Sequence, residues 1–181
     1  MMQINDGRKG TSARVSDNGH LYTLSSMRKL AAEASESGNA HVVESGFITL
    51  TSGGEKGVLK IHTHPSETHI HQIRLQSDAA VRWKVFNKAT SDTFTATGTS
   101  VNMNAGSGTV FDSHVHVGDN TATVTGGILV LSGMSNASKD LVIDLEGMLI
   151  STASTSLYLV AEGAATVHAS VILFTHDTAD H

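Results

Sequence analysis

Apolar and polar residues alternate in short runs along residues 46–86. A period of two is typical of a β-strand with one buried face, because successive side chains of a strand point to opposite sides. In the clearest run Val81, Trp83 and Val85 alternate with basic residues, which predicts that this strand buries its apolar side. The stretch as a whole predicts four strands: Phe47–Thr51, Val58–His64, His69–Leu75 and Val81–Phe86.

Histidines disturb the alternation in the third of these strands. His69 and His71 have the parity of Ile73 and Leu75, which are expected to face the core. Either the imidazoles lie around the edge of a core face, or a β-bulge near Gln72 moves them to the other side.

Beyond residue 86 similar runs recur, separated by clusters of Gly, Ser, Asn and Asp. Turn clusters about 8 to 12 residues apart, with no helix of crossover length, are typical of an antiparallel β-sandwich or jelly roll. A parallel α/β sheet needs such crossover helices, so we predict an all-β fold. The further predicted strands are Thr93–Thr97, Ser100–Asn104, Thr109–Phe111, His114–Val117, Ile128–Leu131, Leu141–Leu145, Met148–Ile150, Ser156–Val160 and Thr166–Phe174.

The first 45 residues follow a different pattern. Glycine recurs at positions 7, 10 and 19, and the only apolar alternation before residue 25 is His20–Leu24. Such a segment cannot bury much of itself, so it is either a disordered tail or an extended arm that becomes ordered on another surface. Apolar residues between Met27 and Ala34 recur at helical spacing and predict one short helix. We therefore expect an extended N-terminal arm with its connecting segment, residues 1–45, and a β-sandwich domain, residues 46–181.

Composition narrows the classes of function. Charged residues make up 16% of the chain, the formal net charge is -5 and no Lys/Arg cluster is present, so no nucleic-acid partner is expected. The chain has no cysteine, which excludes disulfides and thiolate zinc sites. Nothing approaches the roughly 20 consecutive apolar residues of a membrane-spanning helix, so no membrane partner is expected either.

Histidine is the residue type with the widest chemistry in this chain. Eleven are present, and six of them form three His-x-His pairs: His62/His64, His69/His71 and His114/His116. In a strand each pair presents two imidazoles on one face, about 7 Å apart, which is close enough to share a metal ion. The first pair would share its face with Val58. These six residues are the predicted ligands of a transition metal such as Zn, Fe, Ni or Cu, and no other cofactor is expected.

Three interpretations of the pairs stay open. His62, His64 and Glu67 resemble the cupin metal motif, although the spacings are shorter than that motif requires and the Pro-x-Gly expected before His116 is missing. A His-x-His strand repeated in three subunits would instead supply six nitrogens to one ion on a symmetry axis, which resembles some phage fibre tips. In the third interpretation the histidines are surface or interface residues, and an interface containing them is mildly pH-sensitive because histidine titrates near neutrality.

No other catalytic motif stands out. The chain lacks a Gly-x-Ser-x-Gly elbow, a cysteine nucleophile and a Walker or dinucleotide glycine pattern followed by a helix. Ser107 lies between two glycines, as is typical of a turn, and Asp144 and Glu146 are expected to be solvated charges. We expect a protein that is not an enzyme, with a cupin-like metal-dependent enzyme as an alternative.

Several short motifs, taken in order, resemble a family of tailed-phage virion structural proteins. In that family an N-terminal arm and a short connecting segment precede a β-sandwich. The matching stretches are Ile4–Gly7, Ala13–Asn18, Gly46–Glu55, Val85–Asn87 and Gly98–Ser107. The histidine pairs depart from the family's pattern, so the resemblance implies no role for them.

The resemblance implies a non-enzymatic capsid decoration or cement protein. Such a protein binds the major capsid protein or other virion proteins through its N-terminal arm and stabilises the head lattice. The implied state is a homo-oligomer, with a trimer expected, located in the virion and assembled in the host cytoplasm. A tail or fibre component with the same fold is the alternative. Ordering an arm of about 25 residues costs on the order of 1 to 2 kcal/mol per residue in backbone entropy, so such an arm needs a large docking surface.

Overall fold

The structure of the chain is a computed structural model that describes residues 3–5, 12–15, 21–22, 38–63, 67–108, 111, 114–152 and 155–176. For the first three segments and for His176 only the backbone is described. Every regular element in these residues is a β-strand and none is a helix, so the all-β prediction is confirmed. It follows that this part of the chain contains no helix long and apolar enough to cross a bilayer.

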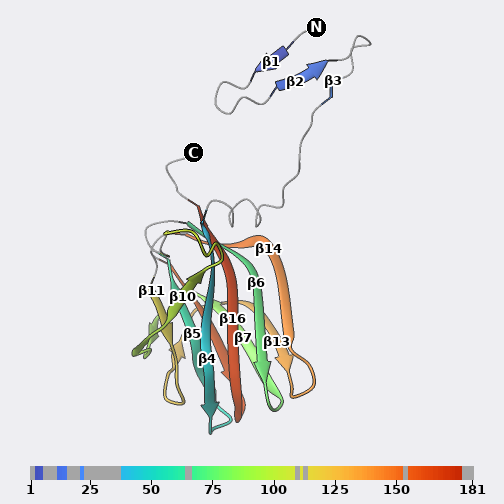
Figure 1. Ribbon diagram of the computed structural model, residues 1–181. Coiled ribbons are helices and arrows are strands. Elements are labelled where there is room, and N and C mark those ends of the chain that lie inside the picture. Colours follow the sequence, from blue (N-terminus) through green and yellow to red (C-terminus); the bar gives the residue numbers. More distant parts are fainter. Residues whose placement is uncertain are drawn as a thin grey trace.

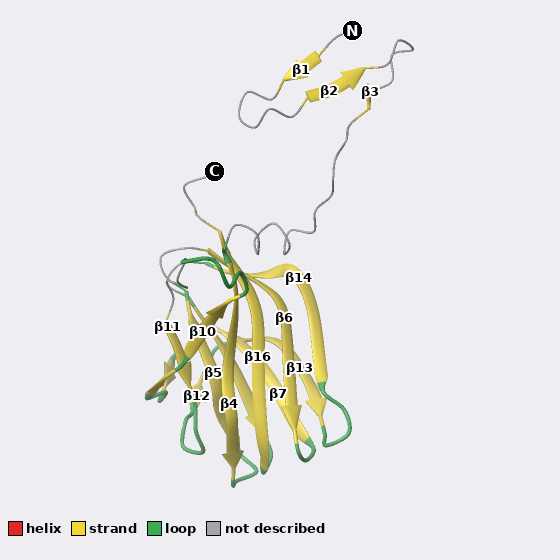
Figure 2. Ribbon diagram, in the orientation of Figure 1, coloured by secondary structure: helices red, strands yellow, loops and turns green. Residues whose placement is uncertain are grey.

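Two antiparallel sheets stack face to face, and loops connect them mainly at the two ends of the sandwich (Figure 1). Figure 2 shows that strands make up almost all of both layers. One sheet has the spatial order β10 (Thr99–Asn102), β4 (Ala40–Leu50), β16 (Ala165–His176), β6 (Glu67–Ser77) and β14 (Leu141–Ser151). The other has the order β13 (Ile128–Ser135), β7 (Val81–Asn87), β15 (Ser156–Glu162), β5 (Glu55–His62), β11 (His114–Val117) and β9 (Ala96–Thr97).

The order of connections identifies a jelly roll. Along β4 to β7 and β13 to β16 the chain changes sheet at every connection except the one between β7 and β13. The first and last of these eight strands, β4 and β16, pair with each other in the five-stranded sheet. Eight strands in this order form two Greek keys that close over one core. The predicted antiparallel sandwich is therefore confirmed, in its jelly-roll form.

Residues 88–127 form an insertion between β7 and β13. The insertion adds β10 beside β4, and β11 and then β9 beside β5. It also contains a small ribbon, β8 (Ser91–Asp92) paired with β12 (Val124–Thr125). The backbone N–H of Gly57 donates to the carbonyl of Ala122 (2.9 Å), and the ring of Phe94 lies 6.2 Å from that of Tyr158, so the insertion covers part of the outer face of the six-stranded sheet. One edge of the jelly roll is thus extended by additional strands, whereas β13 and β14 are terminal strands at the other.

The core between the sheets is apolar and centres on Trp83. Val81, Trp83 and Val85 are at most 1% exposed, which confirms the predicted inner face of this strand. The indole Nε1–H of Trp83 donates to Ser135 Oγ (2.7 Å), and Ser77 Oγ lies 2.6 Å from the same oxygen. The one polar atom of the indole is therefore satisfied, by a group from the edge strand β13.

A β-bulge in β6 resolves the position of the second histidine pair. The pairing with β16 passes from Gln72 directly to Ile70, which leaves His71 as the extra residue. As a result Ile70 and Ile73 are fully buried, while His69 and His71 are only half-buried. Of the two alternatives that the sequence left open, the bulge near Gln72 is confirmed.

A second bulge makes β4 longer than predicted. The strand begins at Ala40, well before the predicted start at Phe47. Ser45 and Gly46 form a bulge, because both lie opposite the single step from His168 to Ser170 in β16, and the pairing with β16 continues on either side of them. Gly46 takes φ = 67°, a conformation that a residue without Cβ adopts readily. Gly46, which directly precedes the predicted strand, therefore lies in a bulge inside β4.

Other predicted elements were wrong in detail. Val58 is the extra residue of a bulge in β5, so it faces the core next to Leu59 instead of sharing a face with His62. The two strands predicted around Leu141–Leu145 and Met148–Ile150 are one strand, β14, whose register shifts between Asp144 and Leu149. Of the predicted strand Thr93–Thr97 only β9 is a strand, and Phe111 belongs to none.

The described N-terminal residues form a separate small sheet. It consists of β1 (Gln3–Asn5), β2 (Ser12–Val15) and β3 (Leu21–Tyr22), paired antiparallel in that order. None of these strands pairs with the jelly roll, and Figure 1 shows them apart from it. The predicted helix between Met27 and Ala34 lies outside the described residues.

We predict that Gly118→Ala destabilises the domain. Gly118 follows β11 and its N–H donates to Val58 O (3.0 Å), and a Cβ there would overlap the carbonyl oxygen of Gly57. Two backbones would have to separate, so we expect a loss of about 2–3 kcal/mol in the free energy of unfolding, measured by urea denaturation. Gly53→Ala is the matched control, because nothing lies within 4 Å of its Cβ position, and it should change the stability by less than about 0.5 kcal/mol. Equal stability of the two variants would contradict this packing.

Candidate functional site

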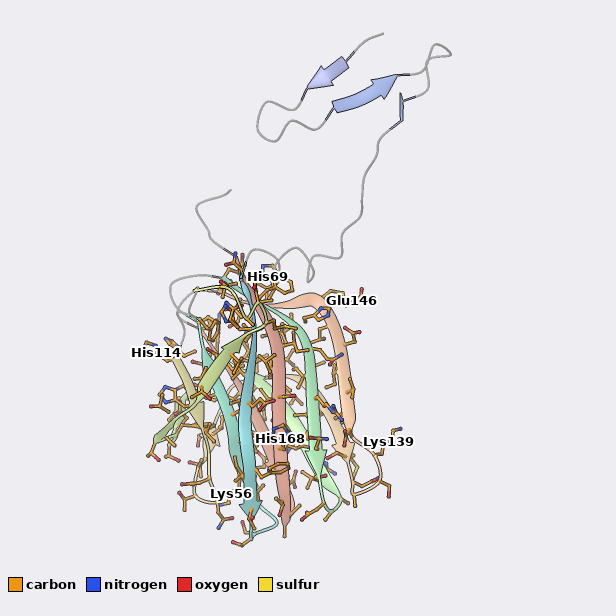
Figure 3. The ribbon with its side chains drawn as sticks, viewed as in Figure 1. Lys56, His69, His114, Lys139, Glu146 and His168 are labelled. Carbon is orange, nitrogen blue, oxygen red and sulfur yellow. The ribbon has the colours of Figure 1, made fainter. Side chains whose placement is uncertain are left out.

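Histidines from two of the predicted pairs meet on the six-stranded sheet. His62 of β5 lies directly opposite His114 of β11, and their ring centroids are 6.1 Å apart. On the other side, His62 Nδ1 lies 2.8 Å from the Oγ of Ser156, its neighbour on β15. Because the adjacent Ile61 and Leu157 belong to the core, this row of side chains faces outward. Figure 3 shows His114 at the side of the domain.

The next row along the same strands contains a charged network. His116 lies opposite Lys60, and Lys60 lies opposite Tyr158. Lys60 Nζ donates to Asp92 Oδ2 (2.8 Å), and the Tyr158 hydroxyl donates to the same oxygen (3.0 Å). Tyr158 is only 4% exposed, although it belongs to the outer face. Asp92 comes from β8, so the network fixes the insertion to the sheet.

Burial and charge act against each other at this network. Burial alone would raise the pKa of the Asp92 carboxyl, but the hydrogen bonds from Lys60 and Tyr158 outweigh it and hold the pKa below its ordinary value. The pKa of His116 is lowered, first by burial and then by the charges of Lys60 and His114. His116 is therefore neutral at neutral pH. Burial also raises the pKa of Tyr158, which keeps its hydroxyl protonated as a donor.

The remaining predicted ligands lie on the other sheet or outside the described residues. His69 stacks on Phe174 with ring centroids 5.1 Å apart, and its Nε2 lies 3.9 Å from Glu67 Oε2. His71 is the bulged residue of the same strand, β6. His64 is not among the described residues.

The structure therefore does not gather the six predicted ligands at one place. It brings together His62 and His114, with His116 two residues further along β11. Within the described ranges, no group of three or more His, Cys, Asp or Glu side chains is arranged to hold a metal ion. A metal shared between subunits through these pairs stays a prediction.

A hollow of about 400 Å³ lies on the outer face of the five-stranded sheet, next to His168 and Phe47. The two rings are 5.0 Å apart, and Phe47 is 80% exposed. Both carboxylates in the lining are engaged: Asp140 accepts hydrogen bonds from Arg74 and Gln76, and Asp78 accepts one from the backbone of Thr166. The hollow therefore offers no unengaged pair of carboxylates for acid–base chemistry.

The sequence analysis missed His41, Lys60, Asp92 and Tyr158. His41 is 1% exposed, its Nε2 has no hydrogen-bond partner among the described residues, and the centroid of its ring lies 5.3 Å from that of Phe111. Burial lowers its pKa, so it is a neutral core residue. Lys60 had a signal in the sequence, because it shares parity with His62, whereas Asp92 lies in a turn cluster whose partner strand cannot be found from local pattern.

Comparison of the chain with protein-family models, with curated proteins and with solved structures gives no match.

We predict that Asp92→Asn destabilises the domain in a pH-dependent way. The variant keeps an acceptor oxygen but removes the negative charge of a largely buried ion pair, so at pH 7 we expect a loss of about 1–3 kcal/mol in the free energy of unfolding. Since the folded pKa of Asp92 is lowered, the wild-type contribution is fully present above about pH 4 and disappears as the pH falls through the folded pKa.

Urea denaturation of both proteins at pH 7 and near pH 3 measures the effect. The difference in unfolding free energy should shrink at the acidic pH. Glu44→Gln, at an exposed carboxylate of β4, serves as the control and should change stability by less than about 0.5 kcal/mol. A pH-independent difference between the wild type and Asp92→Asn would contradict the assigned role of the carboxylate.

Proposed function

We propose that this chain is a non-enzymatic structural protein of tailed-phage virions, a decoration or cement protein of the capsid. It acts as a homo-oligomer that binds the major capsid protein through its N-terminal residues and stabilises the head lattice. Its location is the virion, and it assembles in the host cytoplasm. Nucleic acid, membranes and cofactors have no part in this function.

One observation carries the proposal: the jelly roll is complete between Ala40 and His176 without the residues that precede it. The described N-terminal strands β1–β3 pair only with one another. A domain that does not need its N-terminal segment for its own sheets leaves that segment available to a neighbouring subunit. This arrangement supports the role that the family resemblance implies for the arm.

The fold is compatible with the proposal but does not distinguish it from its alternatives. Jelly rolls occur in viral capsid proteins and also in cupins, so the fold alone identifies neither. The histidines give the enzyme alternative little support, because His62 and His114 face outward from the six-stranded sheet and not into the space between the sheets.

We predict that removal of residues 1–25 abolishes binding to capsids and leaves the jelly roll folded. The described strands among them, β1–β3, belong to neither of the two large sheets, so the thermal midpoint should match that of the full chain. Affinity for purified heads should fall by at least about tenfold, as measured by co-sedimentation. Deletion of residues 177–181, which follow β16, is the matched control and should leave binding unchanged.

The full chain, labelled and visualised by electron microscopy on intact particles, tests the location. Label on the head supports the proposal, whereas label on the tail identifies a tail or fibre component instead. Absence of the label from all particles would contradict a virion role of either kind.

A further inference from the structure

The edge of the jelly roll formed by β13 and β14, here called the β13/β14 edge, has no covering strand among the residues that the structure describes. Both are terminal strands of their sheets and lie along one side of the sandwich (Figure 1). A tight turn joins them, in which the backbones of Asn136 and Lys139 exchange hydrogen bonds of 3.1 and 3.0 Å. Each strand therefore presents a row of backbone donors and acceptors with no neighbouring strand. At the opposite edge the insertion supplies β10 and β11 to the corresponding groups of β4 and β5.

Exposed apolar side chains gather on the β13/β14 edge. Among the described residues ten large hydrophobic side chains are exposed, and seven of them belong to β13 or β14. They include Ile128 and Met134, both 62% exposed, and Met148, which is 78% exposed. Exposed apolar side chains in this number on the two strands of one edge usually mark a contact with a partner.

The core itself approaches solvent at this edge. Seven partly buried hydrophobic residues pack against the core cluster, and five of them lie on the two edge strands: Leu131, Leu141, Ile143, Leu145 and Leu149. A partner that covers the edge would remove these side chains from water as well.

The charges favour a second copy of this chain as that partner. β13 contains no charged residue, so a strongly charged partner would leave its own charges unpaired there. Lys139 precedes β14 and Glu146 lies within it, and neither forms an ion pair with a described residue. Figure 3 shows the two side chains at opposite ends of the β13/β14 edge. An antiparallel arrangement of two copies brings the Lys139 end of one edge to the Glu146 end of the other.

We propose that two copies of the chain associate through the β13/β14 edge, related by a two-fold axis perpendicular to the sheets. Such an axis makes edge strands antiparallel in both layers at once, so β14 meets β14 of the second copy and β13 meets β13. The regular stretches available for pairing are Leu131–Ser135 and Leu141–Asp144, because the register of each strand shifts beyond them. This contact does not depend on the virion role. It differs from the trimer expected from the sequence, which would need a head-to-tail contact with the β9/β10 edge.

The first test is the mass of the full chain in solution. One chain has a mass of 19.0 kDa, and sedimentation equilibrium over a range of concentrations should give twice that value. The double variant Met134→Lys/Val142→Lys should raise the dissociation constant at least about tenfold. Both side chains are more than half exposed, at 62% and 51%, so circular dichroism should show an unchanged fold.

The control is Val101→Lys at the opposite edge. Val101 is 65% exposed on β10, so it matches the other two positions in exposure and in the change made. We expect it to leave the dissociation constant unchanged. An equal loss of association in this variant would point to a head-to-tail contact and overturn the two-fold proposal.

The second test is an exchange of charges. Lys139→Glu and Glu146→Lys should each weaken association by about two- to fivefold, the usual range for an exposed ion pair. The variant that carries both substitutions should recover to within about twofold of the wild type, because the pair then forms with reversed signs. A trimer, a monomer up to about 100 µM, or additive losses in the exchanged variant would overturn the proposal.

Discussion

Stacking of two sheets over one apolar core is the constraint on which the rest of the structure depends. Each of the eight jelly-roll strands must present apolar side chains to the other sheet, although several carry residues that break the alternation. Bulges at Gly46, Val58 and His71 absorb these residues and return the next apolar side chain to the core. The bulge at His71 also keeps His69 and His71 off the buried face of β6. Among the described histidines only His41 is fully buried, and burial keeps it neutral.

Local pattern was sufficient to predict the fold class and the best strands, but it did not predict pairing. The strand β7 could be predicted from Trp83 and its neighbours, because alternation there has no interruption. The start of β4 could not, because a glycine in a bulge and a glycine in a turn look alike in sequence. For β6 the sequence left two positions open for its histidines, at the edge of the core face or on the other side of a bulge. The choice between them depends on contacts with β16, which lies about a hundred residues away in sequence.

At the candidate site, too, local pattern did not predict which strands pair. His62 and His114 meet because an insertion pairs β11 with β5, and nothing near either residue indicates that register. The hydrogen bonds of Asp92 to Lys60 and Tyr158 likewise join the insertion to two jelly-roll strands. Metal ligands were predicted from spacing within one strand, whereas the geometry that decides ligation is set between strands. A jelly roll is compatible with many functions, so the proposed role depends on what lies outside the eight strands: the N-terminal segment and the β13/β14 edge.

The pairing of β4 with β16 has a consequence for the synthesis of the protein. β16 joins β4 to β6 in the middle of the five-stranded sheet, and it is the last of the eight jelly-roll strands in sequence order. Until it emerges, β4 and β6 have no common neighbour and their apolar faces stay open. Pairings between such distant segments also form slowly. The nascent chain therefore cannot complete the five-stranded sheet until β16 has been made, and a chain that terminates before Ala165 lacks the strand that joins β4 to β6.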